Sequence, residues 1–352
     1  MADRASGASA RRLPLRTALA LGGALLLAAV LAGSASGAYP ISPAQLWDVL
    51  MQALGGGGTS PEYLVFMNIR LPRLLLGVAA GAGLGLSGAL MQGLFRNPLA
   101  DPGLIGVSSG AALAAGVAIV VGSRWFPELP RALGSWTLVA MAFGGGLGVT
   151  VLIYALAQSQ GTTRMGLMLL AGIAVNALAG AGLGWLSFLA SDEQLRSLQF
   201  WLLGSLGGAR WSAVALVGAV VAVAAVAGLR LARPLNAIAL GEAQAALLGV
   251  PVEAVKRRAV LVCALAVGAV TATTGIVGFV GLIAPHWVRL VAGPDHRVVL
   301  PGAALLGGAL VLVADAVART LVQPAELPLG VLTALIGVPV FLLMLRHFRS
   351  SV

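Results

Sequence analysis

The chain has 352 residues, of which 59% are hydrophobic and 10% charged, and its formal net charge is +10. Its mean hydropathy is +0.97, whereas soluble globular proteins are nearer half apolar and a quarter charged. This composition excludes a soluble fold of this size. It predicts an all-α integral membrane protein, because a chain in hydrocarbon needs no polar coat and must satisfy its backbone internally.

The N-terminal segment contains several arginines, then an apolar run at residues 17–32 and small residues at 34–38. Two interpretations fit this pattern, a first transmembrane span or a cleaved signal peptide. A short amphipathic helix is predicted at residues 44–54, with Ser42 as its N-cap. The four glycines at 55–58 end that helix, because glycine loses much conformational freedom in a helix.

Further apolar runs follow, each near the roughly 20 residues that a helix needs to cross hydrocarbon. They lie at residues 72–95, 103–122, 133–157, 165–190, 211–230, 259–274, 275–291, 299–321 and 327–345. With the first run they predict about ten transmembrane helices in a single membrane domain, residues 1–352. Loops this short leave no room for a soluble catalytic domain.

Glycine spacing indicates how the predicted spans pack and where they break. Gly77, Gly81 and Gly85 recur every four residues, and Gly180 and Gly184 repeat the spacing. Small residues at this interval let helix backbones approach closely in lipid. The glycine-rich run at 275–281 predicts an interrupted span, and the two X-Pro steps at 97–102 predict a compact turn at 95–102.

Loop charge predicts the orientation of the chain. If the N-terminus is cytoplasmic, most of the 22 Lys and Arg residues fall in cytoplasmic loops. The positive-inside rule therefore places both termini in the cytoplasm. Basic loops also account for the net charge, so a nucleic-acid partner is not expected.

The segment at about 235–258 is the longest polar stretch after the N-terminal region. Gly241 and Glu242 begin a short amphipathic helix that Gly249 ends, and Pro251 suits the first turn of a second short helix. An apolar stripe runs through the segment at Leu240, Leu247, Leu248 and Val252. A solvated loop is the alternative, but such a loop needs no apolar stripe. We therefore predict a rigid cytoplasmic surface that docks a partner.

Several chemistries are absent from the sequence. The only lysine, Lys256, is not part of a phosphate-binding loop, so any ATP that drives this protein is hydrolysed by another chain. The three histidines lack metal-ligand spacing and are expected in loops or at interfaces. The lone Cys263 is expected to pack as a small apolar side chain. No catalytic residue, metal site or bound cofactor is predicted.

Two rival functions remain at this point. An ion-coupled secondary carrier needs an ionisable residue within a span, and Asp315 is the clearest candidate. Arg319 follows it at i,i+4 spacing, so a structural pair or an outer docking charge is the alternative. A membrane enzyme is the second rival, and no catalytic constellation supports it.

Several motifs, in this order, resemble one family along nearly the whole chain. They are Arg70-Leu-Pro-Arg73, Ser87-Gly-Ala-Leu-Met-Gln92, Phe95-Arg-Asn-Pro-Leu-Ala-Asp-Pro-Gly-Leu-Ile-Gly106, Phe200-Trp-Leu-Leu-Gly-Ser-Leu206, Leu240-Gly-Glu-Ala243, Gly278-Phe-Val-Gly-Leu-Ile-Ala-Pro-His286, Asp295-His-Arg297 and Glu326-Leu-Pro-Leu-Gly330. The sequence resembles the permeases of bacterial iron-complex and vitamin B12 ABC importers, the FecCD-like family.

The resemblance implies the type II ABC importer permease architecture in the bacterial inner membrane. It implies a homodimer, two ATPase subunits that hold ATP and Mg²⁺, and a periplasmic substrate-binding protein. The path would be lined by the fifth span, the short helix at 192–200 and the last span.

The resemblance also implies roles for individual residues. Arg70, Arg73 and Arg319 would form an exposed basic rim that faces acidic residues of the binding protein. The cytoplasmic gate would involve Asn97, Leu99, Thr162 and Thr163. The ATPase-coupling residues would be Leu240, Gly241, Glu242, Ala243, Leu247, Leu248 and Gly249.

Among substrates, the sequence is most similar to haem importers. Asp101-Pro-Gly-Leu-Ile-Gly-Val-Ser-Ser-Gly110 and Leu195-Arg-Ser-Leu-Gln-Phe-Trp201 are similar to that branch. Siderophore and vitamin B12 permeases share most of the other motifs and remain the alternatives. The expected mechanism is alternating access driven by the ATPases.

Overall fold

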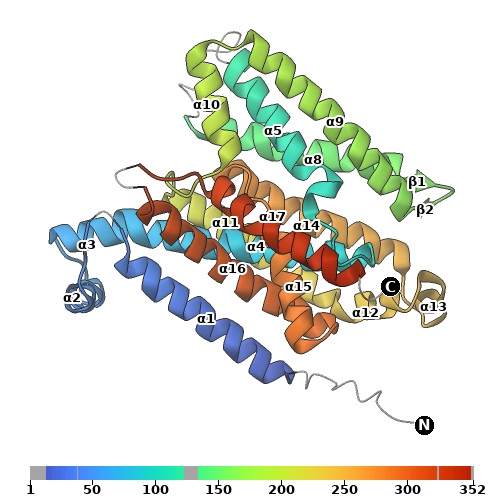
Figure 1. Cartoon of the computed structure of the whole chain (residues 1–352), viewed down its shortest axis with the longest axis horizontal. Coiled ribbons are helices and arrows are strands. Elements are labelled where there is room, and N and C mark those ends of the chain that lie inside the picture. The colour runs from blue at the N-terminus through green and yellow to red at the C-terminus, as the bar shows by residue number, and fades with distance from the viewer. Residues whose placement is uncertain (1–12, 38, 123–133, 323–324, 350–352) are drawn as a thin grey trace.

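The computed structural model describes residues 13–37, 39–122, 134–322 and 325–349, and these are almost entirely helical (Figure 1). The predicted all-α class is confirmed. The one sheet within those ranges is a small hairpin with strands of two residues each, in which β1 (Gln158–Ser159) pairs with β2 (Thr162–Thr163). The predicted helix after Ser42 is also confirmed, with a capping box between Ser42 and Gln45.

The helices of the first half are α1 (Leu15–Ala35), α2 (Pro43–Leu54), α3 (Pro61–Val65), η1 (Phe66–Arg70), α4 (Leu71–Leu94), η2 (Pro102–Ile105), α5 (Val107–Val117), η3 (Ala118–Gly122), α8 (Trp136–Leu156) and α9 (Met165–Leu189). Those of the second half are α10 (Asp192–Leu203), α11 (Trp211–Arg230), α12 (Ala232–Ala239), α13 (Glu242–Leu247), α14 (Val252–Thr274), α15 (Val280–Ala292), α16 (His296–Thr320) and α17 (Leu329–Arg349).

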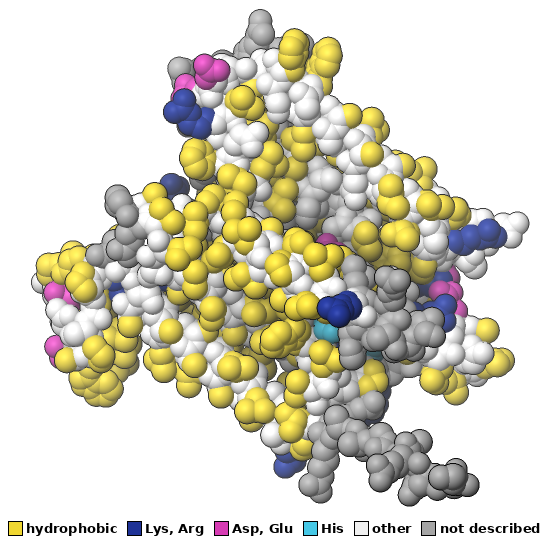
Figure 2. Space-filling view, in the orientation of Figure 1, with side chains coloured by type: hydrophobic (Ala, Val, Ile, Leu, Met, Phe, Trp, Pro, Cys, Tyr) yellow, Lys and Arg dark blue, Asp and Glu magenta, His cyan; other side chains and the backbone are white. Residues whose placement is uncertain are grey.

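Six of the described helices are long and apolar enough to cross a membrane. They are α1, the continuous Pro61–Leu94, α8, α9, α11 and α16. Four more helices bring the set to the roughly ten spans that the apolar runs predict. They are the shorter apolar helices α5 with η3, α15 and α17, and the longer α14, whose first turns are charged. Hydrophobic side chains are spread over much of the visible surface, and charged ones are few and gather near its edges, as a lipid-facing protein requires (Figure 2).

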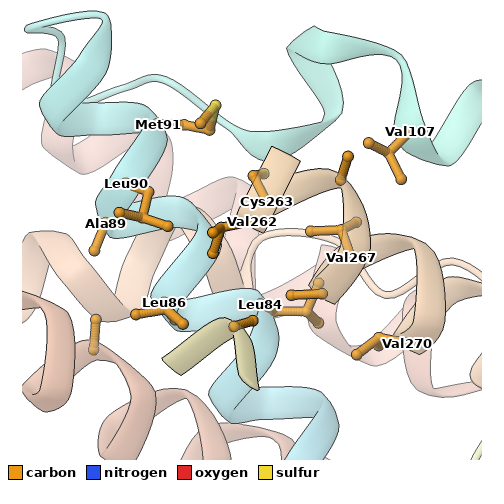
Figure 3. Close-up of a cluster of buried hydrophobic side chains, with 14 of the residues drawn as sticks. Leu84, Leu86, Ala89, Leu90, Met91, Val107, Val262, Cys263, Val267 and Val270 are labelled. Carbon is orange, nitrogen blue, oxygen red and sulfur yellow. The ribbon is translucent and has the colours of Figure 1, made fainter. Parts of the chain in front are cut away.

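The helices form two layers in Figure 1. One contains α5, α8, α9 and α10, and the other is built on α4, against which α11, α14, α15 and α16 pack. Within the second layer, Leu86 and Leu90 of α4 meet Val262, Cys263 and Val267 of α14 (Figure 3). Cys263 is fully buried there, so its expected packing role is confirmed. The first helix, α1, lies along α16.

The glycines explain how closely α4 and α16 approach. A Cβ atom on Gly81 would lie 2.2 Å from the carbonyl oxygen of Gly307, and one on Gly85 would lie 2.0 Å from that of Ala303. The packing role predicted for this stripe is confirmed. For Gly180 and Gly184 it is wrong within the chain, since no atom lies within 4 Å of a Cβ at either position.

Gly81→Ala is expected to lower the free energy of unfolding by about 1–3 kcal/mol, because the backbone of α16 must move away from the added methyl group. Thermal unfolding of the purified protein in detergent measures the effect. Gly144→Ala is the matched control, since its Cβ meets open space on α8. Equal melting temperatures for the two variants would contradict the close approach.

Candidate functional site

At the end of the molecule that carries α2, a charged cluster joins α4, α16 and the loop before α17. The Nη2 of Arg73 donates to Asp315 Oδ1 and to Glu326 Oε2, each at 2.9 Å. The Nε of Arg319 lies 3.0 Å from Asp315 Oδ2. Asp315 is buried between two guanidinium groups, which confirms its i,i+4 pair with Arg319.

Two of the arginines also hold the adjoining end of α1. Arg70 donates from Nη1 to the carbonyl oxygen of Ser34 at 2.6 Å and from Nη2 to that of Tyr39. Arg319 donates from Nη1 to the carbonyl oxygen of Ser36 at 3.0 Å. These bonds satisfy carbonyl groups at and just beyond the C-terminus of α1, which have no partner within the helix.

The expectation that Arg70, Arg73 and Arg319 form an exposed basic rim is wrong. Arg70 is 4% and Arg319 is 9% exposed, and Arg73 is turned inward onto Asp315. A guanidinium carries five donors and is stabilised by a carboxylate or carbonyl acceptor within reach, so these side chains fold onto the protein. The accessible member of the cluster is Glu326. The docking role of the arginines stays a prediction.

At the opposite end, a buried lysine joins three elements. Lys256 of α14 is 1% exposed, and its Nζ donates to Glu242 Oε2 of α13 at 2.7 Å. It also donates to Glu253 Oε1 at 2.9 Å and to the carbonyl oxygen of Thr163 in β2 at 2.8 Å. An ammonium group has three donors, so all three are used.

The same network closes through the backbone of the hairpin. The N–H of Thr163 donates to Glu253 Oε2 at 2.8 Å, and its hydroxyl group donates to Tyr154 at 3.2 Å. The hairpin, the α13 helix and the start of α14 are therefore linked through one buried charge. Because charge-assisted hydrogen bonds are among the stronger ones in proteins, these three elements are expected to move together.

The predicted docking segment presents apolar side chains to solvent. Leu247 is 89% exposed, and Leu240 and Leu248 are also mostly exposed. Gly241 (φ 126°) and Gly249 (φ 78°) bound α13, where a left-handed backbone favours glycine. The predicted short helix at Gly241–Gly249 is thus confirmed. The prediction of a second short helix after Pro251 is wrong, because the long α14 begins at Val252 and the second short helix is α12.

The middle of α12 is anchored to the start of α16. Asn236 donates from Nδ2 to Asp295 Oδ1 at 2.7 Å and accepts from the N–H of His296 at 2.9 Å. His286 lies within α15 rather than in a loop, His296 is the first residue of α16, and both are buried. No group of three potential metal-ligating side chains occurs in the part of the chain that the structure describes.

The four predicted gate residues contact different elements. Asn97 Oδ1 accepts from the N–H of Leu99 at 3.0 Å, which shapes the turn after α4. Leu99 lines a cavity of about 290 Å³ with Phe279 and Phe341. Thr162 and Thr163 lie instead in the hairpin, and Thr163 faces α14. The structure therefore places Asn97 with Leu99 at one point, and Thr162 with Thr163 at another, at the end of the molecule that carries the hairpin.

The predicted interruption at 275–281 is confirmed, and it lies between α14 and α15. Gly275 (φ 72°) and Phe279 (φ 65°) adopt left-handed backbone conformations, so α15 begins at Val280 rather than at 275. A Cβ on Gly337 of α17 would lie 2.3 Å from the Phe279 ring, so that ring packs directly on the last span. Non-helical backbone inside a membrane must line protein or water, and here it lines protein.

Sequence reasoning missed the roles of Lys256, Glu253 and Phe279. One available signal was that Lys256 is the only lysine of an apolar chain and ends the predicted docking segment. For Phe279 the signal was its place inside a glycine-rich interruption, where a bulky side chain is unusual. The partners of both residues are distant in sequence, and no periodicity marks them.

The comparisons with known proteins cover nearly the whole chain. The FecCD transport family matches residues 25–347. The hemin transport system permease protein HmuU of Yersinia pestis is 45% identical over 95% of this chain and 97% of its own length. A vitamin B12 import system permease protein, BtuC of Escherichia coli, is 38% identical over 91% and 92%. An inward-facing conformation of a putative metal-chelate type ABC transporter has a TM-score of 0.82 and 30% identity, over 94% of this chain and 99% of that one. The chain therefore belongs to the FecCD transport family.

Proposed function

We propose that this chain is the membrane-spanning permease of an ATP-driven importer that moves haem from the periplasm to the cytoplasm. The observation that supports haem as the substrate is the 45% identity to a hemin permease along 95% of the chain. A siderophore or vitamin B12 is the second candidate, supported by the 38% identity to a vitamin B12 permease. As a permease, the chain forms no covalent bond with its substrate.

The permease works as a homodimer. Two spans support this assembly, α9 and α17, because each exposes a row of apolar side chains that α4 and its neighbours leave uncovered. Gly180 and Gly184 lie on exposed positions of α9, where small residues let a second helix approach closely. The path for substrate runs between the two copies, along α9, α10 and α17.

Two ATPase subunits, which bind ATP and Mg²⁺, dock on α12 and α13 at the cytoplasmic side. Exposed Leu240, Leu247 and Leu248 on a rigid projection support this role, because a protein gains little by placing such side chains in water without a partner. Both chain termini lie on this side of the inner membrane. Motion of α13 reaches the hairpin through Lys256, and Asn97, Leu99, Thr162 and Thr163 close the gate there.

A periplasmic substrate-binding protein docks at the other end, near α2. Arg70, Arg73 and Arg319 position this surface by holding α1, α16 and the loop before α17 together. Their positive field also favours an acidic partner. With partners docked at both ends, the permease opens the substrate path to one side of the membrane at a time, which is the alternating-access mechanism.

The decisive experiment is co-purification from the native membrane followed by transport in liposomes. Recovery of a P-loop ATPase, and ATP-dependent haem uptake, are the expected results. A chain that purifies alone and transports without ATP would instead favour the ion-coupled carrier, with Asp315 as its coupling group.

Leu247→Asp is expected to weaken ATPase binding by about 30-fold, because the loss of a central apolar contact costs about 2 kcal/mol. Binding of the purified ATPase to the permease in nanodiscs measures the effect. The control is Leu54→Asp, since Leu54 is 82% exposed at the end of α2, on the opposite side of the molecule (Figure 1). Equal binding by both variants would count against docking at α13. Glu242→Lys is a poorer test, because it also breaks the Lys256 ion pair.

A further inference from the structure

A groove of about 790 Å³ runs between α11 and α14. Its walls are almost wholly apolar, with Val220, Val223 and Ala227 on one side and Val255, Leu261 and Leu265 on the other. Val223 and Leu261 are mostly exposed, so the groove opens away from the protein core. Any occupant of this groove therefore presents hydrocarbon to these walls.

Two arginines lie at one end of the groove. Arg230 is the last residue of α11, and Arg258 lies in the second turn of α14. Both are exposed, and no carboxylate is among the residues that line the groove. Within the described chain neither makes an ion pair, whereas Arg73, Lys256 and Arg319 all do.

Two arginines without an ion-pair partner at one end of an apolar groove favour an anionic partner there, because opposite charges attract. The occupant that this geometry favours therefore has an anionic head and an apolar body. A water-soluble anion would leave the apolar walls unfilled.

The position of the groove matches the depth of one membrane leaflet. The arginine end lies where α11 leads into α12 and where α14 begins, at the end of the molecule with the hairpin (Figure 1). The α11 wall extends from Arg230 back to Ala219, or roughly 17 Å at 1.5 Å per residue. Half of a bilayer's hydrocarbon is about 15 Å, so the arginines lie at headgroup level.

We propose that this groove binds one anionic phospholipid, with its phosphate group between Arg230 and Arg258 and an acyl chain along α11 and α14. A site between helices that combines apolar walls with paired basic residues suits anionic lipids of the inner leaflet. The lipid stabilises the junction between α11, α12 and α14. It also lies beside α12 and α13, where the ATPase is proposed to dock. The binding itself needs no ATPase and does not depend on the transported substrate.

Native mass spectrometry of the full-length protein, titrated with phosphatidylglycerol or phosphatidylcholine of the same acyl chains, tests the proposal. The wild type is expected to prefer phosphatidylglycerol. The double variant Arg230→Gln/Arg258→Gln is expected to lose about 30-fold of that preference, since each arginine near a membrane surface contributes about a fivefold effect.

The matched control is Arg233→Gln/Arg257→Gln. It removes the same charge from exposed neighbours that do not line the groove, and it is expected to keep the preference. An equal loss in both double variants would mean general surface attraction and would overturn the proposal. Unchanged preference in the Arg230→Gln/Arg258→Gln protein would overturn it as well.

A steric variant covers the case in which the charge variants fail to fold. Val223→Trp fills the groove from an exposed position and keeps both arginines. It is expected to lower the occupancy of both lipids. Wild-type occupancy of phosphatidylglycerol in this variant would overturn the proposal, whatever transport measurements show about the substrate.

Discussion

Lys256→Met is expected to uncouple ATP hydrolysis from transport. Methionine keeps the length and apolar volume of the side chain but removes all three hydrogen bonds to Glu242, Glu253 and Thr163. Each charge-assisted bond contributes about 1.5–3 kcal/mol. Losing even one therefore shifts the equilibrium between a docked and an undocked hairpin by at least about tenfold.

The measurement is the ratio of haem transported to ATP hydrolysed in liposomes. Arg257→Met is the control, because Arg257 is the adjacent basic residue and is exposed. A purely structural role for Lys256 would lower hydrolysis and transport together and leave their ratio unchanged, which would contradict the coupling role.

The hairpin's position can also be measured without any ATPase. In a Cys263→Ala background, spin labels at Thr162 and Ala246 report the distance between the hairpin and α13. We expect a narrow distribution of the distance between the labels in the protein that keeps Lys256, and a broad one in the Lys256→Met variant. A narrow distribution in both proteins would show that other contacts hold the hairpin.

Asp315→Asn is expected to lower the free energy of unfolding by about 3–5 kcal/mol, because it leaves the buried Arg319 and the half-buried Arg73 without their shared carboxylate. Arg73 and Arg319 both bind Asp315, and one amide group cannot replace two charge-assisted bonds. Chemical unfolding in detergent measures the change. A stable Asp315→Asn protein that has lost gradient-driven transport would instead identify a coupling residue.

Glu326→Gln is the milder comparison at the same cluster. The Glu326 side chain is 45% exposed, so its ion pair with Arg73 is expected to contribute about 0–1 kcal/mol. The hydrogen bond from Arg73 lowers the pKa of Glu326 below its ordinary value. Because this pKa is depressed in the folded protein, the contribution is present at neutral pH and is lost as the pH falls through the folded value.

Short stretches of the sequence were enough to predict the spans, two short helices and the family. The apolar runs predict most of the spans to within a few residues, because transfer of about 20 apolar residues into hydrocarbon is favourable whatever their neighbours are. The exception is α14, which begins at Val252, before the run at 259–274. The capped α2 helix and the α13 helix were likewise predictable from Ser42, Gly241 and Gly249. The motif order along the chain was enough to indicate the transport family.

Side-chain partners were not predictable in this way. Arg73 and Asp315 are 242 positions apart, and Lys256 and Thr163 are 93 apart. No local pattern tells whether a basic residue near a span end faces solvent or folds onto a carboxylate from another helix. For this reason the exposed rim was predicted wrongly and the lysine network was missed.

The sequence by itself determined the membrane class, the approximate spans and the family, since these depend on local hydrophobicity and on motif order. Only the tertiary structure decided which glycines allow close contact, as Gly81 does and Gly180 does not, and where α15 begins. It also decided which charges are buried in pairs and which, like Arg230 and Arg258, remain facing the apolar groove. The physical reason is that burial and pairing depend on which helices meet, and helices meet through contacts far apart in the chain.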